Sequence, residues 1–196
     1  MNRITQKFKE KAADEKLMSL FITAGYPDLE STVEIVLGME ENGADMIELG
    51  MPFSDPLADG PTIQYSSDIA IKNGITIHKI FEIPVDEDEI IETHSKANNL
   101  PIIHLVAPNS TDIRMKLADS KSDGFVYCVS VTGVTGARDG NEVSDSVDRF
   151  IERVNQNIVG NPIMVGFGIK SYEDAQRIAS NADGFIVGSA LINTIK

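Results

Sequence analysis

Short apolar runs rich in β-branched residues alternate along the chain with longer stretches in which apolar positions recur at helical spacing. The apolar runs predict strands at residues 17–23, 46–49, 101–107, 124–130, 162–166 and 184–188. The amphipathic stretches predict helices at residues 29–42, 112–120, 143–157 and 171–179. Strands and helices that alternate at this spacing are typical of parallel strands joined by crossover helices. The pattern therefore predicts an α/β fold, and it shows no linker between two domains.

The alternation fails at one place, near residues 82–84. A helical stretch at residues 77–82 is followed at once by residues 83–89, which lead into a second helix at 87–97 with no strand between them. Only six strands are therefore visible in the 196 residues. A closed barrel of parallel strands, the (β/α)8 or TIM barrel, needs eight.

The composition, 42% hydrophobic and 24% charged, is that of an ordinary soluble domain. No apolar run approaches the roughly 18 residues needed to span a bilayer, and the first eight residues lack the apolar core of a signal peptide. The single cysteine, Cys128, cannot form an internal disulfide and is expected to be a small core residue. These features predict a cytoplasmic protein.

The net charge of −13 argues against nucleic acid or an anionic membrane as a partner. It does not argue against a phosphorylated substrate, because backbone N–H groups and helix N-termini hold phosphate without lysine. The three histidines share no ligand spacing, so we expect no metal site.

The most informative segment is a strand that ends in a carboxylate and continues into a loop rich in Pro, Gly and Asp. Glu48 lies between Ile47 and Leu49, so strand alternation places it on the opposite face from both. A carboxyl group that points into a barrel is desolvated, and its pKa should rise toward the range useful for proton transfer. Taken alone, such a Glu is more often a paired or rim residue, and Asp59 before Gly60 is common in turns.

Two glycine-rich turns follow the last two predicted strands. They are Gly166-x-Gly168 and Gly188-Ser189, and each leads into a helix-like stretch. TIM barrels bind phosphate through backbone N–H groups at these two strand ends. A single Gly-x-Gly is more often a tight turn, but two such turns at neighbouring strand ends favour a phosphate site.

The segment from Glu48 to Asp59 closely resembles the signature of tryptophan synthase α subunits. It has a strand, an acid and a small residue, then Pro-Phe-Ser-Asp-Pro and Ala-Asp-Gly-Pro. Further stretches resemble the family in the family's order, at residues 20–28, 105–112, 124–137, 166–169 and 184–190. The resemblance covers essentially the whole chain. It implies a single TIM-barrel domain over residues 1–196 in which strands 3–4 of the family are absent from the sequence.

The resemblance implies a carbon–carbon lyase of tryptophan biosynthesis that cleaves indole-3-glycerol phosphate to indole and glyceraldehyde 3-phosphate by a retro-aldol step. Glu48 would be the acid/base that protonates the indole ring and takes the hydroxyl proton, and Asp59 would accept the ring N–H. The substrate-binding residues carried over from the family are Phe21, Ile63, Tyr127, Thr135, Gly136, Gly168, Gly188 and Ser189. Among them Phe21, Ile63 and Tyr127 would surround the indole, although plain core packing explains Ile63 equally well. Thr135 would meet Asp59 when its loop closes.

The resemblance also implies a partner. The chain would pair with a pyridoxal-phosphate-dependent β subunit as an α2β2 heterotetramer and pass indole to it, and it would carry no cofactor itself. The loop at residues 51–59, with Pro52 and Asp55, would form part of the contact. Two alternatives stay open: a non-catalytic subunit that only docks on and activates the β subunit, and another phosphate-binding TIM-barrel enzyme such as a sugar-phosphate isomerase.

The missing strands have two explanations. Either residues that the protein possesses are omitted from the sequence between Glu82 and Pro84, or they are truly deleted. We expect omission, because a barrel without two adjacent strands would expose bare strand edges and an open core. A Cα–Cα distance across this point well above the 3.8 Å of bonded residues would indicate omission.

Overall fold

The structure is a computed structural model that describes residues 2–54, 59–76, 101–129, 140–166, 168–169 and 171–195, with the backbone alone for residues 140–146. The predicted helices at residues 77–82 and 87–97 lie outside the described residues. The junction near residues 82–84 also lies outside them, so the expected Cα–Cα gap is not tested.

All six predicted strands are confirmed. They are β1 (Leu17–Thr23), β2 (Met46–Gly50), β3 (His104–Val106), β4 (Val126–Val129), β5 (Ile163–Gly166) and β6 (Gly184–Val187). The third is shorter than the predicted residues 101–107. Among the described residues β3 pairs with β4 alone, and only His104 to Val106 have partners in that register. An apolar run predicts where a strand can form, whereas the neighbouring strand decides how much of it is paired.

Seven helices are described: α1 (Arg3–Glu10), α2 (Ser31–Glu41), α3 (Pro61–Lys72), α6 (Asp112–Lys121), α7 (Gly140–Asn157), α8 (Tyr172–Ala179) and α9 (Ser189–Ile195). The four predicted helices in the described residues are confirmed, and Ser171, the N-cap of α8, makes reciprocal capping bonds with Asp174. The pattern missed α1 and α3, whereas the helix-like stretch predicted after Gly188-Ser189 is confirmed as α9. Helix α1 is 8 residues long and buries Phe8 alone, so its apolar pattern along the chain is short.

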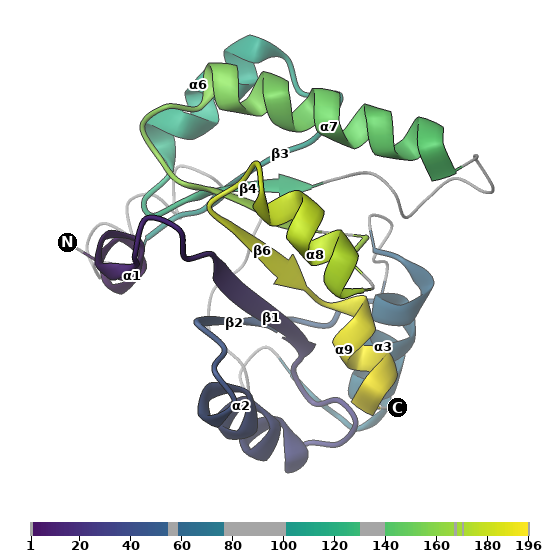
Figure 1. The fold of residues 1–196 in the computed structure, drawn as a ribbon. Coiled ribbons are helices and arrows are strands. Elements are labelled where there is room, and N and C mark those ends of the chain that lie inside the picture. Colours follow the sequence, from purple (N-terminus) through teal and green to yellow (C-terminus); the bar gives the residue numbers. More distant parts are fainter. Residues whose placement is uncertain are drawn as a thin grey trace.

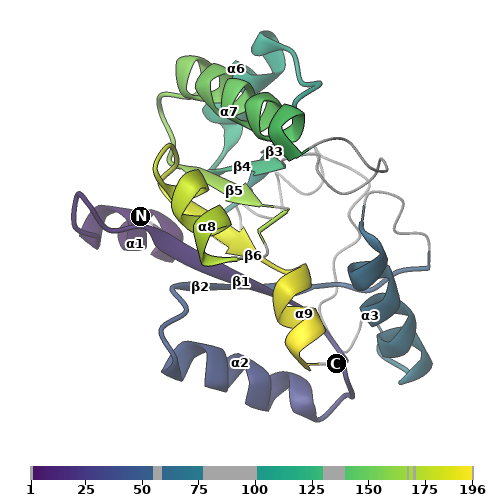
Figure 2. The same cartoon turned by 45° about the vertical axis from the view of Figure 1, so that its right-hand side comes forward.

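The strands form one curled sheet in the order β2-β1-β6-β5-β4-β3, and every neighbouring pair is parallel. Figure 1 shows the helices that follow the strands on the outside of the curl, and the turned view in Figure 2 shows the same arrangement. Helices α3 and α9 contact each other near the end of β1, whereas α1 lies near its start. Within the described residues, the outer edges of β2 and β3 have no strand partner. The fold is thus an α/β barrel of which six strands are seen, as the sequence predicted.

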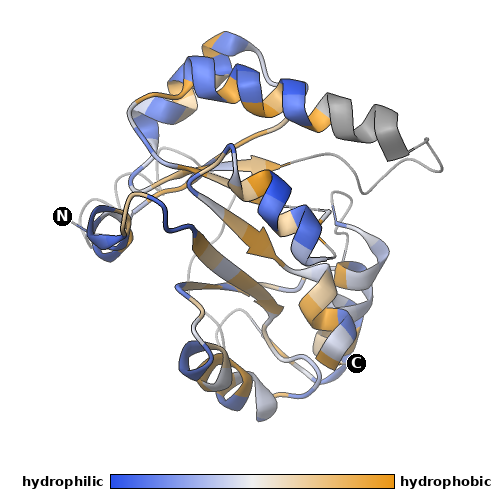
Figure 3. Cartoon of the chain, viewed as in Figure 1, coloured by the Kyte–Doolittle hydropathy of each residue, from blue (hydrophilic) through white to orange (hydrophobic). Residues whose placement is uncertain are grey.

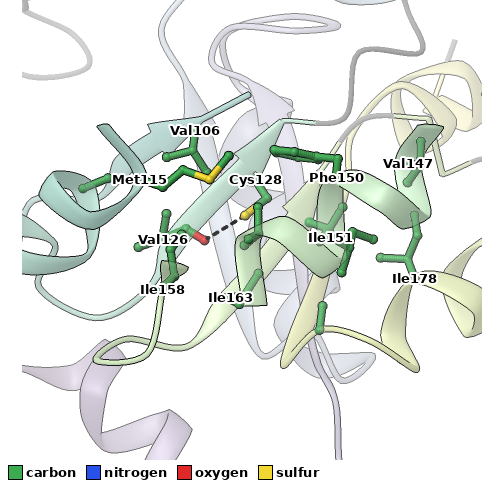
Figure 4. Packing of buried hydrophobic residues seen from close by; sticks show 14 of the residues in the cluster. Val106, Met115, Val126, Cys128, Val147, Phe150, Ile151, Ile158, Ile163 and Ile178 are labelled. Carbon is green, nitrogen blue, oxygen red and sulfur yellow. Dashed lines mark hydrogen bonds between the residues drawn. The ribbon is translucent and has the colours of Figure 1, made fainter. Parts of the chain in front are cut away.

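Apolar packing surrounds the sheet on both faces. Figure 3 shows the strands as predominantly hydrophobic and the outward surfaces of the helices as hydrophilic. Outside the curl, α6, α7 and α8 pack on β3 to β6 around a cluster that includes Val106, Phe150, Ile151 and Val165 (Figure 4). Cys128 belongs to this cluster, and burial raises the pKa of its thiol to about 12. The prediction that Cys128 is a core residue is confirmed.

A second layer fills the inside of the curl near the start of the strands. Its buried members are Phe8, Leu17, Phe125, Met164 and Ile186. The first of them comes from α1, which also bonds to the loop before β2 through Lys7 Nζ and Asp45 Oδ1 at 2.9 Å. The interior is therefore filled with apolar side chains at this end of the sheet. In the part of the chain that the structure describes, no helix is both long and apolar enough to cross a membrane.

Candidate active site

Glu48 and Phe21 lie side by side on the inner face of the sheet. They are partners in the parallel register of β1 and β2, so their side chains point to the same face. Ile47 packs instead on the outer cluster that includes Ile22 and Met39. The predicted orientation of Glu48, opposite to its strand neighbour Ile47, is confirmed.

The carboxyl group of Glu48 is half-buried, and its electrostatics follow from that position. Burial raises the pKa of Glu48 from its ordinary 4.5 to about 7, because desolvation penalises the charged form. Ser19 opposes the shift by donating its hydroxyl to Glu48 Oε1 at 3.3 Å. The expected rise in pKa is confirmed, and it makes Glu48 a group that can both give and take a proton near neutral pH.

Asp59 is held at the start of α3. Its backbone oxygen accepts a hydrogen bond from Gln64 Nε2 at 2.9 Å. The next residue, Gly60, is the N-cap of α3, and its carbonyl accepts from the backbone of Ile63 and of Gln64, both at 3.0 Å. Asp59 is half-buried, and burial raises the pKa of its carboxyl group. The helix therefore fixes the backbone that carries this second acid.

Tyr127, on β4, connects the two acids electrostatically. Burial raises the pKa of its phenol well above the usual value, and the negative charges of Glu48 and Asp59 raise it further. Charges act strongly on a group only at short range, because water and salt screen them at longer distances. Glu48 on β2 and Asp59 at the start of α3 therefore both lie within electrostatic range of the Tyr127 phenol.

Glycines give the rings at this site their space. A Cβ added at Gly50 would overlap the ring of Phe21, and one added at Gly166 would overlap the phenol of Tyr127. At Gly188 an added Cβ would meet the Phe21 Cβ at 3.4 Å, which is ordinary contact. The small residues at the ends of β2 and β5 thus let aromatic side chains lie against the backbone.

Sequence reasoning missed Ser19 and Gly50 as site residues, and it assigned Gly166 only to a phosphate turn. Alternation would have found the first two. Ser19 precedes Phe21 by two residues, and Gly50 follows Glu48 by two, so each shares a strand face with a predicted site residue. The contact between Gly166 and Tyr127 has no such signal, because it joins two strands.

The remaining predicted residues have different positions. Gly168, with a φ of +85°, follows β5 after one residue, and Gly188 and Ser189 join β6 to α9. Ile63 is buried in a cluster with Ile22 and Ile192, against which Phe21 also packs. Pro52 is half-buried in the loop after β2. Thr135, Gly136 and Asp55 lie outside the described residues.

A metal site finds no support in the described ranges. No group of three or more His, Cys, Asp or Glu side chains there is placed to hold a metal ion.

A curled parallel sheet with two acids and a phenol at one site defines an α/β-barrel protein whose site suits proton transfer. The sequence model of the tryptophan synthase alpha chain family matches residues 8–83 and 80–196, and the chain belongs to that family. The tryptophan synthase alpha chain of Christiangramia forsetii is 37% identical, over 100% of this chain and 93% of that protein. That of Thermoanaerobacter sp. strain X514 is 38% identical, over 100% and 91%. A crystal structure of ligand-free tryptophan synthase from M. tuberculosis is similar with a TM-score of 0.83, at 26% identity over 98% of this chain and 91% of that chain.

The comparisons also locate the difference from the family. The two matched stretches meet at residues 80–83. The alignment with the Christiangramia forsetii protein runs over 246 positions, whereas this chain has 196 residues, so at least 50 positions have no counterpart here. The relatives therefore carry a segment that this sequence lacks.

Proposed function

We propose that the chain catalyses the cleavage of indole-3-glycerol phosphate to indole and glyceraldehyde 3-phosphate in tryptophan biosynthesis. The observation that carries the proposal is the position of Glu48 on the inner face of the sheet, beside Phe21 in the register of β1 and β2 and bonded to the Ser19 hydroxyl at 3.3 Å. Membership of the tryptophan synthase alpha chain family supports the same reaction. No observation favours a purely docking role or another barrel enzyme.

Glu48 is proposed to transfer the protons. The bond between indole C3 and the side chain breaks once C3 is protonated, because the ring then draws electrons from that bond. The hydroxyl of the side chain loses its proton as the bond breaks and becomes the aldehyde. A carboxyl group with a pKa of about 7 can serve both steps, since both of its protonation states are populated at neutral pH.

Asp59 is proposed to accept the hydrogen bond of the ring N–H. Positive charge builds on this nitrogen when C3 is protonated, and a nearby carboxylate stabilises it. Phe21, Tyr127 and Ile63 would surround the indole ring. Phe21 is paired with Glu48 in the register of β1 and β2, and Tyr127 lies over Gly166 on the inner face, which supports this role.

The phosphate is proposed to bind at the ends of β5 and β6. These strands are parallel neighbours in the sheet, so the turns after them, with Gly168 after β5 and with Gly188 and Ser189 after β6, lie at the same end of the sheet. Backbone N–H groups in such turns bind phosphate without a basic side chain, in keeping with the net charge of −13. Thr135 and Gly136 would join the site from their loop.

We further propose that the chain works with a pyridoxal-phosphate-dependent β subunit in an α2β2 assembly, with no cofactor of its own. Family membership supports this, and the solved relative from M. tuberculosis is described as tryptophan synthase. The loop after β2, with Pro52 and Asp55, would lie at the contact. Residues 1–196 are proposed to form one domain, and a role in amino-acid biosynthesis suits a cytoplasmic location.

An indole-release assay tests the proposal. Purified chain, with and without a tryptophan synthase β subunit, is given indole-3-glycerol phosphate, and indole is measured directly. Glu48→Gln and Asp59→Asn should each lower kcat by about 10²–10⁴-fold. The matched control is Glu34→Gln on α2, an exposed carboxyl away from the site, which should retain activity. Wild-type chain that releases no indole under either condition rules the proposal out, and activation of the β subunit without indole release would instead support the docking role.

A further inference from the structure

Ser19 is a buried hydroxyl that the reaction described above does not use. It lies on β1 with only 1% of its surface exposed. Its hydroxyl donates to Glu48 Oε1 at 3.3 Å, so a polar group inside the sheet meets the proposed acid/base. A buried hydroxyl without a partner would cost stability, which makes this contact a specific feature rather than a surface accident.

The register explains the geometry. Ser19 is paired with Met46, and Glu48 is paired with Phe21, so Ser19 and Glu48 are diagonal neighbours on the same face of the two strands. The hydrogen bond therefore joins β1 and β2 on their inner face, two residues before Phe21 along β1.

We propose that Ser19 is a positioning residue that holds the Glu48 carboxylate at the level of the reaction and favours its ionised form. The inference rests on the proposed function of Glu48 and adds a residue to it. A hydroxyl that donates to a carboxylate stabilises the charged form and fixes the direction of the side chain. Without it, burial alone would hold Glu48 more firmly protonated and leave it free to turn.

The other groups that face Glu48 act differently. Tyr127 reaches the site from β4 and Asp59 from the start of α3, and a negative charge on either side chain disfavours a charged Glu48. Inner-face positions on β5 and β6 hold Met164 and Ile186, which do not titrate. In the described part of the site, the hydroxyl of Ser19 donates to the carboxylate of Glu48.

Three substitutions of Ser19 distinguish the effect of its hydrogen bond from the effect of its side-chain volume. Ser19→Ala removes the donor, Ser19→Cys keeps a similar volume with a weak donor, and Ser19→Thr keeps the hydroxyl. The titration of Glu48 is followed by NMR of the ¹³C-labelled carboxyl group in the ligand-free chain. We expect Ser19→Ala and Ser19→Cys to raise the pKa of Glu48 by about 0.5–1 pH unit, and Ser19→Thr to restore it. Thr23→Val is the matched control, because Thr23 is a buried hydroxyl of the same strand bonded to Ser66 rather than to an acid.

Kinetics give the second reading. Ser19→Ala and Ser19→Cys should lower kcat by about 3–10-fold and change KM by no more than about twofold. The pKa of Glu48 that appears in the pH profile of kcat/KM should shift to a higher pH. An unchanged Glu48 titration in correctly folded Ser19→Ala and Ser19→Cys overturns the proposal, and so does a Thr23→Val shift of equal size. Because the titration needs no turnover, it distinguishes failure of this inference from failure of the proposed reaction.

Discussion

The phenol of Tyr127 occupies the space beside Gly166 where any other residue would place its Cβ. The two residues lie on neighbouring strands, and Gly166 does not have a positive φ, so its backbone would accept an L residue. The requirement for glycine is therefore one of contact and not of conformation. It links the end of β5 to the position of a ring that is influenced by both acids.

This relationship predicts the effect of Gly166→Ala. The added methyl group should displace Tyr127 and cost about 1–3 kcal/mol of unfolding free energy, measured by urea denaturation. The cost should shrink when Tyr127 is also changed to Ala, because the colliding ring is gone. In Gly38→Ala on α2 the new Cβ meets nothing within 4 Å, and it should stabilise the chain by about 0.5–1 kcal/mol. If Gly166→Ala costs the same unfolding free energy with and without Tyr127→Ala, the contact between the two residues is contradicted.

Glu48 should make stability depend on pH. Its pKa is about 7 in the folded chain and near its ordinary 4.5 in the unfolded chain, so the folded state binds more protons between these values. The wild-type chain should therefore lose stability as pH rises from about 4.5 to 7. Glu48→Gln removes this loss, and its Tm should exceed that of the wild type by about 2–6 °C above pH 7, with no difference below pH 4.5. A difference in Tm that is constant with pH would exclude a raised pKa.

Asp119, near the end of α6, is hydrogen-bonded to the turn before β5. Its carboxylate accepts from the backbone of Val159 at 2.9 Å, of Gly160 at 3.0 Å and of Asn161 at 2.9 Å. Burial acts to raise the pKa of Asp119, but these hydrogen bonds outweigh it and hold the pKa below the ordinary 3.8. Such a group adds stability above pH 3.8 that is lost as pH falls.

We expect Asp119→Asn to lower the unfolding free energy by about 1–2 kcal/mol at pH 7, measured by urea denaturation. The difference from wild type should narrow below pH 3.8 as the native carboxyl is protonated. Asp14→Asn, at an exposed position before β1, is the matched control and should change stability little. If Asp119→Asn lowers the unfolding free energy by the same amount below pH 3.8, its effect does not come from the charge of the Asp119 carboxylate.

The segment missing relative to the family leads to a prediction about the natural protein. If residues are omitted near residues 82–84, protein isolated from its source should have an intact mass above the 21.3 kDa of this sequence. The physical reason is that the outer edges of β2 and β3 would otherwise lack strand partners and favour aggregation. A mass of 21.3 kDa in a monodisperse protein would instead establish a true deletion.

The sequence was sufficient for features that depend on neighbours along the chain. Each strand in the described residues was visible as an apolar run, because burial between two layers needs consecutive apolar residues. The inward direction of Glu48 followed from the two-residue period of a strand. The segment from Glu48 to Asp59 was recognisable because its residues are contiguous, and the comparisons confirmed the family.

Contacts between distant segments needed the folded chain. Ser19 meets Glu48 across 29 positions, and Tyr127 reaches the acids from a strand far along the sequence. Ile192 of the short helix α9 is buried because it packs in one cluster with Ile22 of β1 and Ile63 of α3. Sheet order, register and curl decide these neighbours, and no local pattern encodes them, since the same apolar runs could pair in other orders. The sequence alone therefore identified the two acids, whereas the burial and the neighbours that set their pKa values depend on the tertiary structure.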